Sequence, residues 1–175
     1  NNLPFEPKGK VISITNSTIK KHNIKRNEGT KRTVAYIGPD EEYKGYFDFL
    51  EFTKKIDLSK YQINTYGHFP NEFAPAYIEQ KGRFSQDQLG KVYSEIDYLI
   101  IPSRWKETFG LVTLEALSFG VNVFVSENVG AKDLVDSAHR FRTLEEVDLN
   151  TGLGVTKRIE TLDNHVRNLQ NLYLN

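Results

Sequence analysis

The feature that most restricts the fold is a series of short apolar runs separated by helical segments. "TVAYIG" (33–38), "YQINTYG" (61–67), "DYLIIPS" (97–103) and "VNVFVS" (121–126) are rich in β-branched and aromatic residues. The third and fourth have consecutive apolar side chains, as strands do when both faces of their sheet are covered. Such alternation favours a parallel sheet with right-handed crossovers and helices on both faces. We therefore expect an α/β, Rossmann-like fold whose ligands bind at the carboxyl ends of the strands.

Helical segments fill the gaps between these runs. The stretch "YFDFLEFTKKI" (46–56) is expected to form the first helix. Ser85 and Gln88 have the spacing of a capping box, and apolar residues at helical spacing follow them. "TFGLVTLEALSFG" (108–120) is expected to form a helix closed by its final glycine. A last helix is expected within residues 155–174, with an apolar stripe of Val155, Ile159, Leu162, Val166 and Leu169.

The composition excludes several classes of function. The chain has 175 residues, which suits one domain, with 23 basic and 23 acidic residues. This balance gives no electrostatic reason to expect nucleic acid or an anionic membrane as a partner. The lack of cysteine excludes disulfides, cysteine-based zinc sites and thiol nucleophiles. No apolar run approaches the roughly 18 residues of a membrane span, and no secretory signal opens the chain, which fits a cytoplasmic protein.

The first residues differ in character from the rest. Residues 1–31 are mostly polar, and "KKHNIKRNEGTKR" (20–32) is typical of a basic, solvated linker. We expect residues 1–31 to be a linker segment and residues 32–175 to form the domain. The chain starts with Asn1 and contains no methionine, so we expect it to be a piece of a longer protein.

Three groups of candidate residues follow strands. In the loop after the first strand, Gly38 permits a tight turn, and Lys44 lies where a helix begins. A lysine beside helix N–H groups can hold phosphate, although a surface lysine in an acidic loop is the alternative. After the strand that ends at Pro102 and Ser103, a helix is expected to start near Thr108–Gly110. Its free N–H groups and the helix dipole would stabilise an anion. In the third group, "SENVGAKDLV" (126–135), Gly130 could open a helix whose N–H groups face a ligand, and Asp133 could be only a first-turn carboxylate.

Two glutamates, Glu107 and Glu115, lie eight residues apart around this helix start. Eight helical residues rise by about 12 Å, whereas the carboxylates of glycosidases lie roughly 5–9.5 Å apart. A hydrolytic pair is therefore disfavoured. Two carboxylates on either side of a helix N-terminus suit a long ligand with hydroxyls at both ends and phosphate between them, such as a nucleoside diphosphate sugar. The alternatives are a helix-start carboxylate for Glu107 and a lone surface charge for Glu115.

In order along the chain, these segments resemble the donor-binding half of retaining glycosyltransferases of the GT-B fold, glycosyltransferase family 4. The likeness runs from about Thr33 to Val135. It rests on "YIG" followed by Lys44-Gly45, on "KGRFSQDQLGKVYSEIDYLIIPS", on the E-x7-E motif "ETFGLVTLE" and on "ALSFGVNVFVSENVGAKDLV". The resemblance implies that the donor is a UDP- or GDP-sugar and that no cofactor or metal is bound.

The resemblance also implies individual roles. Glu107 would bond the donor sugar, and Glu115 would accept hydrogen bonds from the ribose. Lys44 would neutralise the leaving diphosphate, so Glu107 and Lys44 are the expected catalytic residues. The other expected donor-binding residues are Gly38, Gly82, Arg83, Phe84, Arg104, Thr108, Phe109, Gly110 and Leu111.

The sequence also departs from the family pattern. The family usually has an arginine directly after the glycine of the first strand, where this chain has Pro39. Arg104 or Lys106 is the candidate replacement for that charge. The usual Gly-Gly-x-x-Glu turn is replaced by residues 130–133, Gly-Ala-Lys-Asp. We expect the acceptor-binding N-terminal domain of the family to lie outside this chain, because residues 1–31 resemble the crossover from it.

These observations give one leading expectation and several rivals. The leading one is the donor-binding domain of a bacterial glycosyltransferase of polysaccharide or glycoconjugate synthesis, here an isolated and largely inactive half. Any membrane contact would be made through the missing half. The first rival is a degenerate domain of the same fold that binds a nucleotide sugar or a partner without turnover. An epimerase, a phosphorylase or a signalling domain is a weaker rival, and Asp40 fits a phosphoacceptor poorly.

Overall fold

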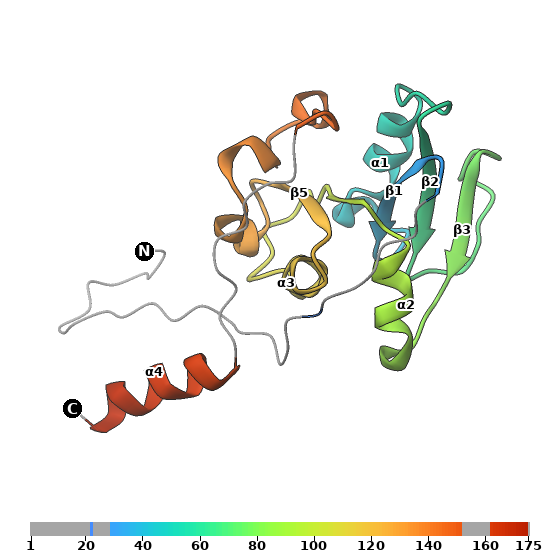
Figure 1. Ribbon diagram of the computed structural model, residues 1–175. Coiled ribbons are helices and arrows are strands. Elements are labelled where there is room, and N and C mark those ends of the chain that lie inside the picture. The colour runs from blue at the N-terminus through green and yellow to red at the C-terminus, as the bar shows by residue number, and fades with distance from the viewer. Residues whose placement is uncertain (1–21, 23–28, 152–161, 175) are drawn as a thin grey trace.

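The computed structural model describes residues 22, 29–151 and 162–174, and its described part is built on one parallel sheet (Figure 1). Six strands of these residues pair in the order β3-β2-β1-β4-β5-β6, and every pairing is parallel. The expected α/β, Rossmann-like class is therefore confirmed. The strands are β1 (Arg32–Ile37), β2 (Tyr61–Tyr66), β3 (Ile78–Gly82), β4 (Tyr98–Ile101), β5 (Asn122–Ser126) and β6 (Arg140–Phe141).

The strand order reverses beside β1. The chain runs from β1 outward to β2 and β3, then crosses back so that β4 lies on the other side of β1. The segments that follow β1 and β4 therefore lead to helices on opposite faces of the sheet. In open parallel sheets this switch point is where ligands bind.

Helices cover both faces of the sheet. The helix α1 (Tyr46–Thr53) packs on one face, and α2 (Leu89–Ser94) and α3 (Leu111–Ser118) pack on the other (Figure 1). Alternation along β1 divides the core accordingly, because Val34 and Tyr36 join the cluster under α1, while Ala35 joins the cluster under α2 and α3. The consecutive apolar residues of the central strands follow from this burial on two sides.

Short 3₁₀ helices complete the loops: η1 (Glu42–Lys44), η2 (Gln86–Gln88), η3 (Gly130–Leu134), η4 (Ser137–His139) and η5 (Leu144–Glu146). The capping box predicted from Ser85 and Gln88 is present at η2, where Gln88 Oε1 accepts the backbone N–H of Ser85 at 2.9 Å. It positions the chain for α2, which follows directly.

The structure differs from the sequence expectations at several elements. Strands β3 and β6 were not expected, and α3 begins at Leu111 instead of 108. The last helix is α4 (Leu162–Leu174), which buries no residue, while Val155 and Ile159 lie outside the described residues. Most of the expected linker 1–31 is outside them too. Within the described ranges, no helix is long and apolar enough to cross a membrane.

Candidate functional site

Two oppositely charged side chains meet at the switch point of the sheet. Lys44 ends η1 after β1, and Glu107 lies in the loop after β4. Lys44 Nζ lies 3.0 Å from Glu107 Oε1, and the two side chains are 31% and 18% exposed. The structure thus brings together the two residues that the sequence put forward as catalytic. The pair leaves a cation and a carboxylate partly open to a ligand.

Close backbone packing sets this distance. Gly45, which follows Lys44, has a φ of 75°, and a Cβ there would lie 2.0 Å from the carbonyl oxygen of Pro102. Only glycine lets the β1 loop lie directly against the end of β4. The backbone N–H groups of Arg104 and Trp105 also donate to the carbonyl oxygen of Tyr43, at 3.0 and 3.3 Å. The loop that carries Lys44 is therefore tied to the loop that leads to Glu107.

The loop after β5 holds Glu107 from the other side. The Glu107 N–H donates to the Asn128 carbonyl at 2.9 Å, and the Gly130 N–H donates to the Glu107 carbonyl at 3.2 Å. A Cβ at Gly130 would lie 2.3 Å from the Thr108 carbonyl oxygen, so glycine permits this contact. Gly130 was considered as a helix start whose N–H groups face a ligand. Its N–H is instead used to brace Glu107, and Asp133 pairs with Arg140 at 3.2 Å.

The N-terminus of α3 lies next to Glu107. Gly110 is the N-cap residue, and no side chain among the described residues caps this helix. Glu107 Oε2 lies 3.4 Å from where a Cβ of Gly110 would stand. The first N–H groups of a helix have no partner within it, and the helix dipole makes this end attractive to anions. Leu111 is 61% exposed, as expected of a residue at an open helix start. Thr108 is exposed and Phe109 half-buried.

Glu115 lies on α3, one turn beyond this helix start. The hydroxyl of Tyr93 in α2 donates to Glu115 Oε2 at 3.1 Å. Burial, and next the charge of Glu115, raise the pKa of Tyr93 far above its ordinary value, so the hydroxyl stays protonated. A carboxylate has about four lone-pair sites, so Glu115 keeps the capacity to accept further hydrogen bonds from a ligand.

The remaining expected donor residues lie along the carboxyl edge of the sheet. Gly38 follows β1, and its N–H donates to the Tyr66 carbonyl at 3.0 Å. Gly82 ends β3. The guanidinium of Arg83 lies 5.1 Å from the ring centroid of Phe69, and Phe84 packs edge-on against Tyr66. These residues follow the strands on one side of β1, and the glutamates follow β4 on the other.

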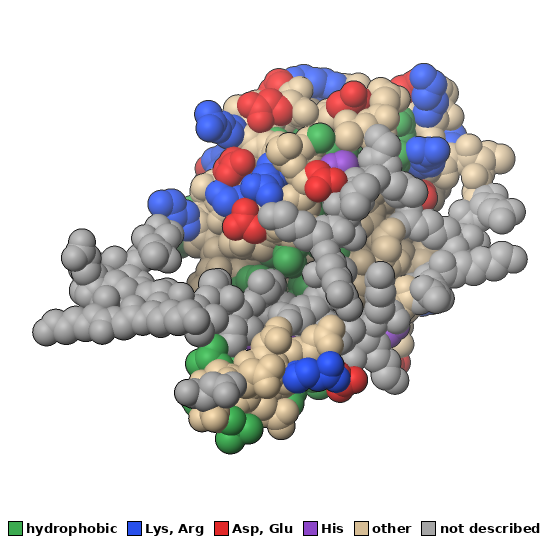
Figure 2. Space-filling model, turned by 60° about the vertical axis from the view of Figure 1, so that its left-hand side comes forward, with side chains coloured by type: hydrophobic (Ala, Val, Ile, Leu, Met, Phe, Trp, Pro, Cys, Tyr) green, Lys and Arg blue, Asp and Glu red, His purple; other side chains and the backbone are tan. Residues whose placement is uncertain are grey.

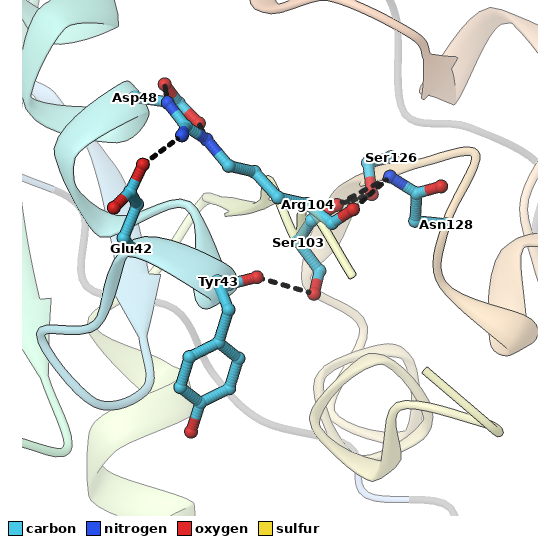
Figure 3. Close-up of polar contacts among 7 residues, drawn as sticks. All are labelled: Glu42, Tyr43, Asp48, Ser103, Arg104, Ser126 and Asn128. Carbon is cyan, nitrogen blue, oxygen red and sulfur yellow. Dashed lines mark hydrogen bonds and ion pairs between the residues drawn. The ribbon is translucent and has the colours of Figure 1, made fainter. Parts of the chain in front are cut away.

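The side chain of Arg104 is bound by carboxylates of η1 and α1. Its guanidinium donates to both oxygens of Asp48 and to Glu42, each at 2.6 Å, as Figure 3 shows. The hydrogen bond to Asp48 raises the pKa of Arg104 above its ordinary value. The structure therefore does not bring Arg104 to Lys44, and its charge is already matched by two carboxylates.

Three contributors to this site were not anticipated. Tyr93 lies in the helix expected after Gln88, and its hydroxyl reaches Glu115 through a contact between α2 and α3. The backbone carbonyl of Asn128 accepts the N–H of Glu107. Its side-chain amide donates to the carbonyls of Ser103 and Arg104 (Figure 3). The carbonyl of Tyr43 likewise accepts backbone N–H groups, those of Arg104 and Trp105. Such backbone contacts between loops leave no signal in residue type.

The charges on one face and the possible metal ligands among the described residues bear on other kinds of site. Figure 2 shows acidic and basic side chains interspersed over the visible face, with no basic surface of the kind that binds nucleic acid. Among the described residues, no group of three or more His, Cys, Asp or Glu side chains could hold a metal ion. A cavity of about 530 Å³ lies beside α1, lined by residues that include Lys55, Asn128 and Thr143.

Comparison with known proteins gives a family match. The model of the glycosyl transferases group 1 family matches residues 17–141. An uncharacterized 41.2 kDa protein in the cps region of Klebsiella pneumoniae is 28% identical over 151 residues. The match covers 84% of this chain and 40% of that protein, so this chain spans about two fifths of that relative's length.

Two solved structures share the fold. The C-terminal domain of a glycosyl transferase group 1 family protein (LpcC) from Francisella tularensis has a TM-score of 0.57 at 16% identity, covering 74% of this chain and 83% of that one. Anabaena Alr3699/HepE, solved in complex with UDP and glucose, has a TM-score of 0.56 at 13% identity, covering 83% of this chain and 39% of that one. At such identities the likeness establishes the fold alone.

Proposed function

Because the chain belongs to the glycosyl transferases group 1 family and has the fold of a GT-B C-terminal domain, we propose that it binds the nucleotide-sugar donor of a retaining glycosyltransferase. One observation carries the proposal. The Lys44–Glu107 pair stands beside the uncapped N-terminus of α3, at the switch point of a parallel sheet. This arrangement offers an anion site and a hydroxyl acceptor side by side at the carboxyl edge of the sheet.

Different residues bind different parts of the donor. The ammonium of Lys44 and the N–H groups at Gly110 and Leu111 hold the diphosphate, and Glu107 accepts hydrogen bonds from the sugar hydroxyls. In the transfer, the bond from the anomeric carbon to the diphosphate oxygen breaks, and a bond to an acceptor oxygen forms. The acceptor proton ends on the released nucleoside diphosphate. Positive charge placed where the diphosphate departs lowers the barrier to this step.

Two groups of residues bind the nucleoside, one for the ribose and one for the base. Glu115 accepts hydrogen bonds from the ribose hydroxyls with the lone pairs that Tyr93 leaves open. Gly82, Arg83 and Phe84 lie along the base, and Gly38 lets the backbone approach the donor. A uridine donor is supported by the related fold solved with UDP and glucose.

The parent protein is proposed to act in bacterial polysaccharide synthesis on the cytoplasmic side. The support is the Klebsiella pneumoniae relative in a cps region. That relative is more than twice as long as the matched segment, which leaves room for an acceptor-binding half that precedes this domain. The isolated chain is therefore expected to bind donor weakly and to transfer little sugar, and robust transfer by it alone would contradict this.

Removal of the Glu115 carboxylate tests the proposal. Calorimetric titration with UDP-, GDP- and ADP-sugars should show one nucleotide class binding, and Glu115→Ala should weaken that binding about 10- to 100-fold, since hydrogen bonds to a charged group are worth about 1.5–3 kcal/mol. Glu95→Ala is the matched control, because Glu95 also accepts a tyrosine hydroxyl, that of Tyr66 at 3.3 Å. Unchanged binding in Glu115→Ala, or no nucleotide binding at all, would refute the proposed roles.

A degenerate domain that binds donor without turnover is the second candidate. Pro39 favours it, because the family's usual arginine is absent and Arg104 is held by Asp48 and Glu42. Pro39→Arg should tighten UDP binding roughly tenfold through a new charge-assisted hydrogen bond. If the parent protein already transfers sugar with proline in place, the degenerate reading is wrong. If only the arginine variant transfers, that reading is right.

A further inference from the structure

An exposed phenylalanine and an exposed arginine stack on each other at the carboxyl edge of the sheet. Phe69 lies in the loop after β2 and is 70% exposed, and Arg83 directly follows β3. The guanidinium carbon of Arg83 lies over the Phe69 ring, 5.1 Å from its centroid. Arginine stacks on aromatic faces through a cation–π contact, which favours one position of its long side chain. We call Phe69 and Arg83 the stacked pair.

Contacts between neighbouring loops tie the stacked pair to the proposed donor site. The strands β1, β2 and β3 lie side by side in the sheet (Figure 1). The N–H of Gly67 donates to the carbonyl oxygen of Gly82 at 2.9 Å. His68, which is 5% exposed, donates from Nδ1 to the carbonyl oxygen of Gly38 at 2.9 Å, since a carbonyl oxygen can only accept. Phe69 comes directly after this buried residue, so the loop that carries its ring is bound to the loops after β1 and β3.

The residue after Arg83 fixes the backbone but leaves the guanidinium free to move. Phe84 packs edge-on against Tyr66, with ring centroids 6.2 Å apart, and against the core cluster under α2 and α3. The side chain of Arg83 is exposed. Ordering such a long side chain during binding costs conformational entropy, and a side chain that is ordered beforehand avoids this cost. The Phe69 ring supplies that order before a ligand arrives.

In the proposed function, on which this inference rests, Arg83 lies along the nucleobase of the donor. We propose that Phe69 is a positioning residue, which holds the guanidinium of Arg83 so that the face turned away from Phe69 stacks on the base. The order of the stack is then ring, guanidinium and base. Stacking of this kind accepts every base, because each base has a π face. The stacked pair therefore strengthens nucleotide binding without selecting uracil over guanine or adenine.

Calorimetric titration of the full 175-residue chain with UDP, GDP and ADP, and with inorganic pyrophosphate, tests this role. Arg83→Ala should weaken nucleotide binding about tenfold, because the stack on the base is lost. Phe69→Ala should weaken it about two- to fivefold, since a cation–π contact at an exposed site is a modest interaction. Neither change should alter the binding of pyrophosphate, which has no base. Phe69→Tyr keeps the ring and should retain the affinity of the unsubstituted chain.

A double-mutant cycle separates positioning from direct contact with the ligand. In the Arg83→Ala background, Phe69→Ala should cause no further loss of nucleotide affinity, because Phe69 acts on the base only through the guanidinium. Phe73→Ala is the matched control and should leave nucleotide affinity unchanged. Phe73 lies in the same loop and is 60% exposed, but its ring packs on that of Phe47, with centroids 5.6 Å apart.

The outcomes are distinguishable. Equal losses from Phe69→Ala with and without Arg83 would show that Phe69 touches the ligand itself or acts on the fold, and would overturn the proposal. A loss of pyrophosphate affinity, or a loss of the same size in Phe73→Ala, would overturn it too. If Glu115→Ala weakens nucleotide binding but Phe69→Ala does not, this inference fails while the proposed function stands. If no nucleotide binds the unsubstituted chain, the proposed function fails first and this inference fails with it.

Discussion

Lys44 and Glu107 are the residues to which we assign the chemistry of the proposed function, and they form an ion pair with each other. Each charge is partly withdrawn from water, and the 3.0 Å ion pair compensates for that loss. A diphosphate entering beside them brings a second anion to the same ammonium. The ammonium of Lys44 can then bind the diphosphate together with the N–H groups at the start of α3.

Lys44→Met should therefore reduce affinity for UDP about tenfold or more while leaving the much weaker binding of uridine unchanged, because only the diphosphate meets the ammonium. Calorimetry with the two ligands measures this difference. Lys54→Met is the control, since Lys54 also pairs with a carboxylate, that of Glu51 at 2.6 Å, but lies at the end of α1. Equal losses for uridine and UDP would mean that Lys44 acts on the fold instead of on the phosphate.

Glu107 is held in place by three loops, which follow β1, β4 and β5. The β5 loop contributes most directly, because its carbonyls and N–H groups bond both sides of the Glu107 peptide. The contact between Gly130 and Thr108 leaves no room for a side chain. The position of the carboxylate is thus set by backbone packing, a requirement that glycine meets at Gly130 and Gly45.

Gly130→Ala should lower the free energy of unfolding by about 1–3 kcal/mol and weaken UDP binding, because the new Cβ must push the Thr108 peptide, and Glu107 with it, out of place. Urea unfolding and calorimetry measure the two effects. Gly90→Ala offers the opposite case: Gly90 lies within α2 with no atom near its Cβ direction, so alanine should stabilise the chain slightly and leave binding unchanged. Similar destabilisation by both changes would contradict the packing argument.

Much of this organisation could be predicted from sequence because the central strands are buried on both faces. The runs around Ala35, Leu99 and Val123 are continuously apolar for that reason. Strand β3 was missed because it lies at the sheet edge, where "IEQKG" alternates buried and exposed residues and includes three polar side chains. The start of α3 was placed three residues early, because the β5 loop, which no local pattern reveals, holds 107–109 out of the helix.

Some residues of the candidate site could also be predicted from the sequence, and others could not. Residue types and the E-x7-E spacing indicated Lys44, Glu107 and Glu115. The partner of Glu115 could not be anticipated, because Tyr93 reaches it only after α2 and α3 pack on the same face. Arg104 was chosen by proximity in sequence, and its direction was decided by Asp48, a residue on α1 that is 56 positions away.

The whole molecule buries several tyrosines around the two faces of the sheet. Burial is the main cause that raises the pKa of Tyr36, Tyr66 and Tyr93 above the ordinary value of 10.0. The folded chain keeps these hydroxyls neutral at pH values where the unfolded chain ionises them. Their contribution to stability is complete below about pH 10 and is lost as the pH rises above it.

Tyr93→Phe should accordingly make stability less sensitive to alkali. Between about pH 9 and pH 11 the free energy of unfolding of the unsubstituted chain should fall by about 1 kcal/mol more than that of Tyr93→Phe, since one ionising group has been removed. Urea unfolding at the two pH values measures this. Tyr173→Phe removes a tyrosine that is 81% exposed and should behave like the unsubstituted chain. Parallel pH profiles for all three proteins would contradict the argument.

The central claim is that a nucleoside diphosphate binds at the switch point between β1 and β4. Backbone amide NMR of the chain titrated with UDP tests it most directly. We predict that the largest shift changes fall at Lys44, Gly45 and 109–111, with smaller ones near Glu115. Changes confined to the cavity beside α1, around Lys55 and Thr143, or no changes at all, would contradict it.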